Sequence, residues 1–140
     1  MKRKNIAVLM TALDSDGQAE ILKGIELCGK ENGCNVAVFL WFTGTYEKER
    51  HNLGELNMAM LPDLNLFDGI ILLADAFHIK ENKDRIEQML EKVTCPIVTI
   101  GCRYKNAPAV WSDNYAGMRR LMEYMVKERG LRRLHFVRGI

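Results

Sequence analysis

The chain has 140 residues, a length that suits one domain and lets it bury roughly 68% of its unfolded surface. Its composition, 48% hydrophobic and 27% charged, is close to the globular average and excludes a disordered or low-complexity chain. The net charge of +2 arises from 20 basic and 18 acidic residues spread along the sequence, so it indicates no nucleic-acid partner.

The N-terminal segment superficially resembles a signal peptide, because basic Met1–Asn5 precedes apolar Ile6–Met10. The apolar run is too short to span a bilayer and no small-residue cleavage site follows it, so we expect a strand and no membrane contact. The four Cys and three His residues form no Cys-x-x-Cys pair and no cluster with metal-ligand spacing. We therefore expect reduced structural thiols in a cytoplasmic protein, with no metal and no cofactor.

Apolar runs of strand length alternate with segments of helical period along the whole chain. The predicted strands are Ile6–Met10, Val36–Phe42, Gly69–Ala74, Ile97–Gly101 and Leu134–Val137, with a short extended piece at Ala109–Trp111. This alternation predicts βαβ units, and strands that are apolar throughout indicate helices on both faces of the sheet. We expect one α/β domain over residues 1–140, a three-layer α/β/α sandwich around a five-stranded parallel sheet.

Each of the four predicted helices carries an apolar stripe that we expect to lie in the core. The stripes are Ile21, Leu22, Ile25 and Cys28; Leu53, Leu56 and Met60; Ile86, Met89, Leu90 and Val93; and Met118, Leu121, Met122 and Met125. Gly33 and Gly130 stand where helix C-caps are expected.

Polar residues follow the apolar runs, where open parallel sheets place their ligand crevice. We expect a polar small molecule to bind at Asp14, Ser15, Asp16 and Gln18 after the first strand, Thr43 after the second, Asp75 after the third, Arg103 after the fourth, and Asp113 after the short extended piece. Structural roles compete with this interpretation: the Asp14–Asp16 cluster suits a turn or N-cap, Asp113 or Asn114 suits the cap of the fourth helix, and Arg103 suits a solvated surface.

The sequence contains no Gly-x-Ser-x-Gly elbow, no P-loop and no Gly-x-Gly-x-x-Gly after the first strand, so we expect no enzymatic activity. Asp14, Asp16 and Asp75 suggest a rival, a flavodoxin-like or receiver-like phosphoacceptor whose acids hold magnesium. The spacing disfavours that rival, because Thr11–Leu13 separates the first strand from its acids and Arg138 stands where a receiver has Lys.

Several partial motifs, in order, are similar to those of one family. They are Ile6-Ala-Val-Leu-Met, Phe67-Asp-Gly-Ile-Ile-Leu-Leu, Pro96-Ile-Val-Thr-Ile, Ser112-Asp-Asn-Tyr-Ala-Gly-Met and Gly130-Leu-Arg-Arg-Leu-His-Phe-Val. The whole chain resembles the N-terminal subdomain of LacI-type, periplasmic-binding-protein-like (type 1) ligand sensors, a flavodoxin-like lobe.

This resemblance implies a small-molecule ligand, often a sugar or related polar metabolite, held between two subdomains. Arg103 matches, with a one-residue shift, the Arg of a strand-end pair that grips sugar hydroxyls in the family. Family repressors place a helix-turn-helix before the first strand, where this chain has Met1–Asn5, so no direct nucleic-acid contact is implied. The resemblance also implies a second lobe after Ile140 and an output domain of a transcription regulator or signalling protein, such as a GGDEF diguanylate cyclase, a histidine kinase or an AraC-type domain.

Part of one sheet face should lack a covering helix, and exposed apolar area of that kind predicts a homodimer or docking onto the second lobe. An alternative is therefore a dimerisation or interaction module with a degenerate pocket.

Overall fold

The computed structural model describes residues 3–11, 16–42, 49–73 and 80–137, and within them all side chains except those of residues 16, 49 and 80–82. The chain separates into two compact units, Met1–Val110 and Trp111–Ile140, which are described one after the other and are called unit 1 and unit 2. The sequence analysis expected one domain over residues 1–140, and that assignment stays a prediction.

Unit 1 contains a five-stranded sheet in the order β2-β1-β3-β4-β5, and every pair of neighbours is parallel. Its strands are β1 (Asn5–Thr11), β2 (Asn35–Trp41), β3 (Gly69–Leu73), β4 (Ile97–Ile100) and β5 (Ala109–Val110). The first four lie close to the predicted ranges, and the α/β class with a five-stranded parallel sheet is confirmed.

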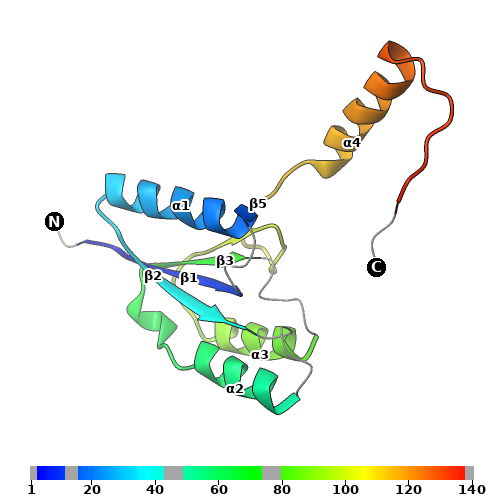
Figure 1. Ribbon diagram of the computed structural model, residues 1–140. Coiled ribbons are helices and arrows are strands. Elements are labelled where there is room, and N and C mark those ends of the chain that lie inside the picture. The colour runs from blue at the N-terminus through cyan, green and yellow to red at the C-terminus, as the bar shows by residue number, and fades with distance from the viewer. Residues whose placement is uncertain (1–2, 12–15, 43–48, 74–79, 138–140) are drawn as a thin grey trace. The chain divides into compact units, whose positions relative to one another are not determined.

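The helices of unit 1 lie on both faces of the sheet. They are α1 (Asp16–Glu31), α2 (Glu49–Ala59) and α3 (Lys80–Glu91), with a short 3-10 helix η1 (Leu64–Leu66) before β3. In Figure 1, α1 lies on one side of the sheet while α2 and α3 lie on the other. The predicted three-layer arrangement is therefore present in unit 1.

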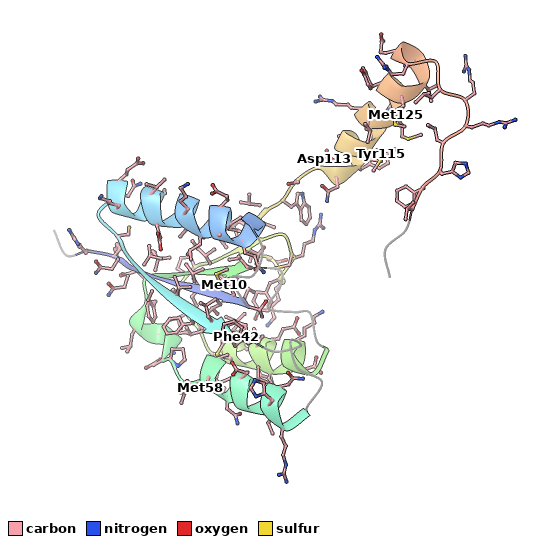
Figure 2. All side chains as sticks on the ribbon, viewed as in Figure 1. Met10, Phe42, Met58, Asp113, Tyr115 and Met125 are labelled. Atoms are coloured by element: carbon pink, nitrogen blue, oxygen red, sulfur yellow. The ribbon has the colours of Figure 1, made fainter. Side chains whose placement is uncertain are left out.

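The alternation of β1 side chains explains why the strand is apolar throughout. Ala7 and Leu9 belong to the core cluster that includes Leu56 of α2 and Ile86 of α3. Val8 and Met10 belong to the opposite cluster, beneath α1, where Figure 2 labels Met10. Since successive side chains of a strand point to opposite faces, helices on both faces require apolar residues at every position.

The predicted strand at Leu134–Val137 is wrong. These residues have no strand pairing, and the place beside β4 is taken by Ala109–Val110, which the sequence marked only as a short extended piece. A strand is stable when a neighbouring strand takes its backbone hydrogen bonds, and β5 already takes the edge of β4. The fifth strand therefore comes from a different part of the chain than the apolar pattern predicted.

Both predicted glycine C-caps are confirmed. Gly33 and Gly130 each have φ of +64°, the left-handed conformation that glycine adopts at low cost. The backbone N–H of the residue after each glycine donates back to a carbonyl of its helix, from Cys34 to Gly29, five positions earlier, and from Leu131 to Met125, six positions earlier. Helix α1 thus ends in a Schellman motif, whereas the helix before Gly130 ends in the wider closure of a π-helical turn.

Unit 2 consists of α4 (Asn114–Glu123), a π-helical turn η3 (Tyr124–Glu128) and a segment without regular structure that ends the described residues. The fourth predicted stripe belongs to this unit, and its assignment to a core is wrong: neither α4 nor η3 has a buried residue, and Leu121 is 50% exposed. A segment of about 30 residues is too small to enclose a core of its own. Figure 2 shows Tyr115 and Met125 on this unit.

None of the described helices combines the length and the apolar character that a membrane span requires.

Candidate functional site

The carboxyl ends of the five strands meet at one edge of the sheet. The registers pair Thr11 with Trp41, Leu73 with Ile100, and Ile100 with Val110, so the last residues of neighbouring strands lie side by side. Segments that leave these strands therefore start from a common edge, where open α/β sheets bind their ligands.

Half of the predicted site residues cannot be placed. Asp14, Ser15, Thr43 and Asp75 lie outside the described residues, and Asp16 is the first residue of α1 but its side chain is also outside them. The structure therefore does not test whether these carboxylates and hydroxyls lie close together, and their role in binding a ligand remains a prediction.

Gln18 and Arg103 are described, and both belong to the carboxyl edge. Gln18 is half-buried in the first turn of α1, which follows the central strand β1. Arg103 is exposed in the loop between β4 and β5. Strand β3 separates β1 from β4 in the sheet order, so the two residues project from segments on either side of β3.

The loop that carries Arg103 is anchored from below by a buried threonine. The Thr99 hydroxyl, fully buried within β4, donates to the carbonyl of Cys102 at 2.8 Å. The same residue's backbone N–H donates to the carbonyl of Pro108 at 2.9 Å, which closes the other end of the loop. The backbone of the loop that carries Arg103 is therefore held at both ends by hydrogen bonds to Thr99, as is expected for a loop that carries a recognition residue.

Tyr104 and Lys105 complete the loop. Tyr104 is buried in the core cluster, and the Ala107 N–H donates to its carbonyl at 2.9 Å. Lys105 donates to Glu91 of α3 at 3.0 Å, and its ammonium lies 5.5 Å from the centre of the Tyr104 ring. The hydrogen bond from Lys105 to Glu91 raises the pKa of that lysine. The aromatic ring and the ion pair hold the loop against α3.

The carboxyl end of β2 carries two aromatic residues that the sequence analysis did not select. Trp41 is fully buried, and its indole N–H has no hydrogen-bond acceptor among the described residues. The Phe42 backbone N–H donates to the Glu55 carboxylate of α2 at 3.1 Å, and Glu55 lies 3.6 Å from His51. The two aromatic residues at the end of a predicted strand are a sequence signal that could have identified this position. The contact with Glu55 could not be predicted, because it depends on how α2 packs.

Asp113 has a structural role in unit 2. Its carboxylate accepts a hydrogen bond from the Ala116 N–H at 2.8 Å and caps α4. The competing interpretation of Asp113 as a helix cap is therefore confirmed, and its role as a ligand-binding residue is not tested.

The edge offers hydrogen-bonding and stacking groups. Across the ranges that the structure describes, no group of three or more His, Cys, Asp or Glu residues could hold a metal ion. A cavity of about 620 Å³ lies elsewhere, on the face of the sheet beneath α1, and its lining is chiefly apolar. The volume and the polar chemistry thus occur at different places in unit 1.

No family model matches this chain, and no curated protein matches its sequence. Among solved structures the chain is similar to the lac repressor dimer bound to operator and the anti-inducer ONPF, with a TM-score of 0.61 and 13% identity. The alignment covers 89% of this chain and 41% of the repressor chain, so this chain spans less than half of that protein's length. Likeness at this identity shows the fold alone, and the chain accordingly has a LacI-like, periplasmic-binding-protein-like α/β fold.

Proposed function

We propose that this chain is a non-enzymatic ligand-sensing module of a regulatory protein, equivalent to the N-terminal lobe of a two-lobed sensor. Its ligand is a polar small molecule, sugar-like in its hydroxyl groups, which binds at the carboxyl edge of the sheet. Binding acts by favouring one arrangement of the lobes over another.

One observation carries the proposal: the loop after β4 presents Arg103 on a fixed base. Thr99, Tyr104 and Lys105 hold that loop from three directions, through a buried hydroxyl, a buried ring and an ion pair. A loop whose backbone is already held loses little freedom on binding, and the planar fork of Arg103 suits ligands rich in oxygen.

The likeness to the lac repressor supports a regulatory role. That repressor was solved bound both to an operator and to the anti-inducer ONPF. We carry over to this chain the sensing of a small molecule. We propose a cytoplasmic location and an output domain elsewhere in the parent protein, of the GGDEF, histidine kinase or AraC type.

A dimerisation module is the second candidate function, and the apolar cavity beneath α1 together with the exposed side chains of unit 2 favours it. The two candidates are compatible, because a sensor lobe can also be the part of a regulator that self-associates.

The test is a binding experiment on the 140-residue chain with a panel of sugars, polyols, nucleosides and ONPF, by thermal shift and then calorimetry. We expect at least one saturable hit. Arg103→Ala should weaken its binding about 10- to 100-fold, the effect of losing a charged hydrogen bond, while Arg103→Lys should restore little because the planar fork is lost.

Arg85→Ala provides the matched control, since Arg85 is an exposed arginine of α3. It should bind the hit with unchanged affinity. A panel without any saturable hit, or equal losses in Arg103→Ala and Arg85→Ala, would contradict the proposed site.

A further inference from the structure

Trp41, the last residue of β2, is fully buried, yet its indole N–H has no hydrogen-bond acceptor among the described residues. Buried polar groups in folded proteins almost always have a partner, because an unpaired donor that has lost its water costs free energy. The burial arises within unit 1, since every member of the core cluster that contains Trp41 belongs to residues 1–110. The acceptor of this N–H is therefore either an ordered water or an atom of a ligand.

Trp41 lies at the boundary of the core. The next residue, Phe42, is 43% exposed, and Figure 2 labels it at the end of β2. Thr11 is the register partner of Trp41 on β1 and is 9% exposed. Residues paired in register lie on the same face of a sheet, so the Thr11 hydroxyl and the Trp41 ring share a face. A group that enters the edge between β1 and β2 therefore has a short path to the indole N–H.

A carboxylate from α2 flanks this position. Oε2 of Glu55 accepts a hydrogen bond from the Phe42 backbone N–H at 3.1 Å, and its Oε1 lies 3.6 Å from Nε2 of His51. These contacts fix the orientation of the carboxylate, and the Glu55 side chain is 24% exposed. An ionised carboxylate offers about four acceptor positions, so Glu55 can accept a further hydrogen bond from a ligand.

The three groups fit the surface of a sugar ring. The apolar face of such a ring packs on an exposed aromatic side chain such as Phe42. A hydroxyl is both a donor and an acceptor, so a ligand with several hydroxyls can donate to Glu55 and accept from the Trp41 N–H. A water molecule would satisfy the indole but would make no use of the aromatic ring, and an anionic group would be repelled by the carboxylate.

We propose that the end of β2 is a second binding subsite of the carboxyl edge, in which Trp41, Phe42 and Glu55 hold one sugar-like ring. This β2 subsite rests on the proposed function and specifies the ligand class of the same edge. Strands β1 and β3 lie between β2 and β4, so the ends of β2 and β4 are about 14 Å apart. A single sugar ring is too short to contact both the β2 subsite and Arg103, so the ligand is a two-ring compound such as a disaccharide.

The test observes the indole N–H directly in the full chain. The sequence contains two tryptophans, so ¹⁵N-labelled protein gives two indole cross-peaks, and Trp111→Phe identifies that of Trp41. The protein is titrated with maltose, cellobiose, lactose and trehalose, and with glucose and galactose. We expect at least one disaccharide to shift the Trp41 indole proton downfield in a saturable manner, because a new hydrogen bond deshields it. Its component monosaccharides should bind at least about 10-fold more weakly.

Variants of the β2 subsite give the second measurement, by calorimetry with the same disaccharide. Phe42→Ala and Glu55→Gln should each weaken binding about 10-fold, through loss of the stacking ring and of a charged acceptor. Leu66→Ala and Glu87→Gln are the matched controls and should leave the affinity unchanged. Leu66 is exposed at the amino edge before β3, and Glu87 on α3 pairs with the residue four positions before it, as Glu55 does.

The N–H itself is deleted with the benzothiophene analogue of tryptophan at position 41, which has sulfur in place of the N–H and keeps the shape of the ring. This replacement avoids the loss of core volume that Trp41→Phe would cause. It should weaken binding of the disaccharide about 10-fold and leave the thermal transition of the free chain unchanged, since the N–H has no partner to lose.

Three results would overturn the β2 subsite. One is an indole N–H that is already hydrogen-bonded in the free chain, which ultraviolet resonance Raman spectroscopy of the Trp111→Phe protein detects. Another is a Trp41 cross-peak that no sugar of the panel moves. The third is an equal loss of affinity in the β2 variants and in their matched controls. Circular dichroism and thermal transitions establish that every variant is folded.

The measurements also separate this subsite from the proposed function. A compound whose binding depends on Arg103 but leaves the Trp41 signal in place refutes the β2 subsite and leaves the sensor standing. A disaccharide that shifts the Trp41 signal and binds Arg103→Ala with unchanged affinity supports the β2 subsite and refutes the role proposed for Arg103.

Discussion

Both units of this chain contain apolar residues in regular patterns, but the two units differ in how far those residues are buried. In unit 1, Leu9, Leu72 and Ile86 are fully buried between the sheet and its helices. In unit 2, Phe136 is 81% and Val137 is 91% exposed, although both belong to a run that reads as a strand. The comparison teaches that an apolar pattern specifies a surface to be buried, while burial itself requires a partner of sufficient size.

The largest expected effect compares one leucine from each unit. Leu72→Ala should lower the free energy of unfolding by about 3–5 kcal/mol, because it leaves a cavity in a fully packed core. Leu121→Ala should change it by less than about 0.5 kcal/mol in the monomer, since that side chain is half exposed. Urea denaturation at a concentration below dimer formation measures both, and a comparable loss in the two variants would show that unit 2 has a packed core.

The next effect concerns Thr99, which links the core of unit 1 to the candidate site. Thr99→Val removes the hydroxyl that donates to the Cys102 carbonyl and should cost about 1–2 kcal/mol. Thr99→Ser keeps the hydroxyl and provides the control for the hydrogen bond. If the loop supports Arg103 as proposed, Thr99→Val should also weaken the best ligand of the panel more than Thr99→Ser does.

A matched pair of glycines tests the comparison at the helix ends. Gly33 and Gly130 share a φ of +64°, and a Cβ at either position meets nothing within 4 Å, so only backbone strain opposes alanine. Gly33→Ala should lower the stability of unit 1 by about 1 kcal/mol, whereas Gly130→Ala should leave that transition in place and increase hydrogen exchange at the end of η3. Gly54→Ala, in the middle of α2 with open space at its Cβ, should stabilise unit 1 by about 0.5–1 kcal/mol. Equal shifts for Gly33→Ala and Gly130→Ala would mean that the two units unfold together.

The smallest expected effect is a pH dependence confined to unit 1. The Lys4 ammonium donates to Asp68 at 2.7 Å, and this hydrogen bond, followed by the attraction of the two charges, raises the pKa of Lys4 above the ordinary value of a lysine. A raised lysine pKa stabilises the fold fully below the unfolded value, and the contribution disappears as the pH rises through the folded value. Melting temperatures from about pH 9 to about pH 11.5 should fall more steeply for the wild-type chain than for Lys4→Met. Parallel profiles would show that the exposed pair contributes nothing.

The sequence predicted where in the fold the candidate site lies, but it predicted few of the contacts between the residues of that site. The apolar runs predicted the carboxyl edge, and Arg103 followed directly from its place after the fourth run. Thr99 and Glu55 escaped notice because a polar residue within a strand or on a helix face shows no partner until the chain is folded. Asp113 illustrates the converse, since the short distance to the Ala116 N–H made its cap predictable from local sequence.

The sequence by itself determined the α/β class, the parallel sheet, the ranges of β1 to β4 and the glycines that end two helices, because these follow from local periodicity and backbone preference. The tertiary structure decided which segment became the fifth strand and which apolar stripes were buried. Ala109–Val110 has only two residues and little pattern of its own, yet it pairs with β4, while Leu134–Val137 has the stronger pattern and no strand partner. Pairing and burial depend on a second surface that arrives from elsewhere in the chain, and periodicity within a segment does not encode where that surface lies.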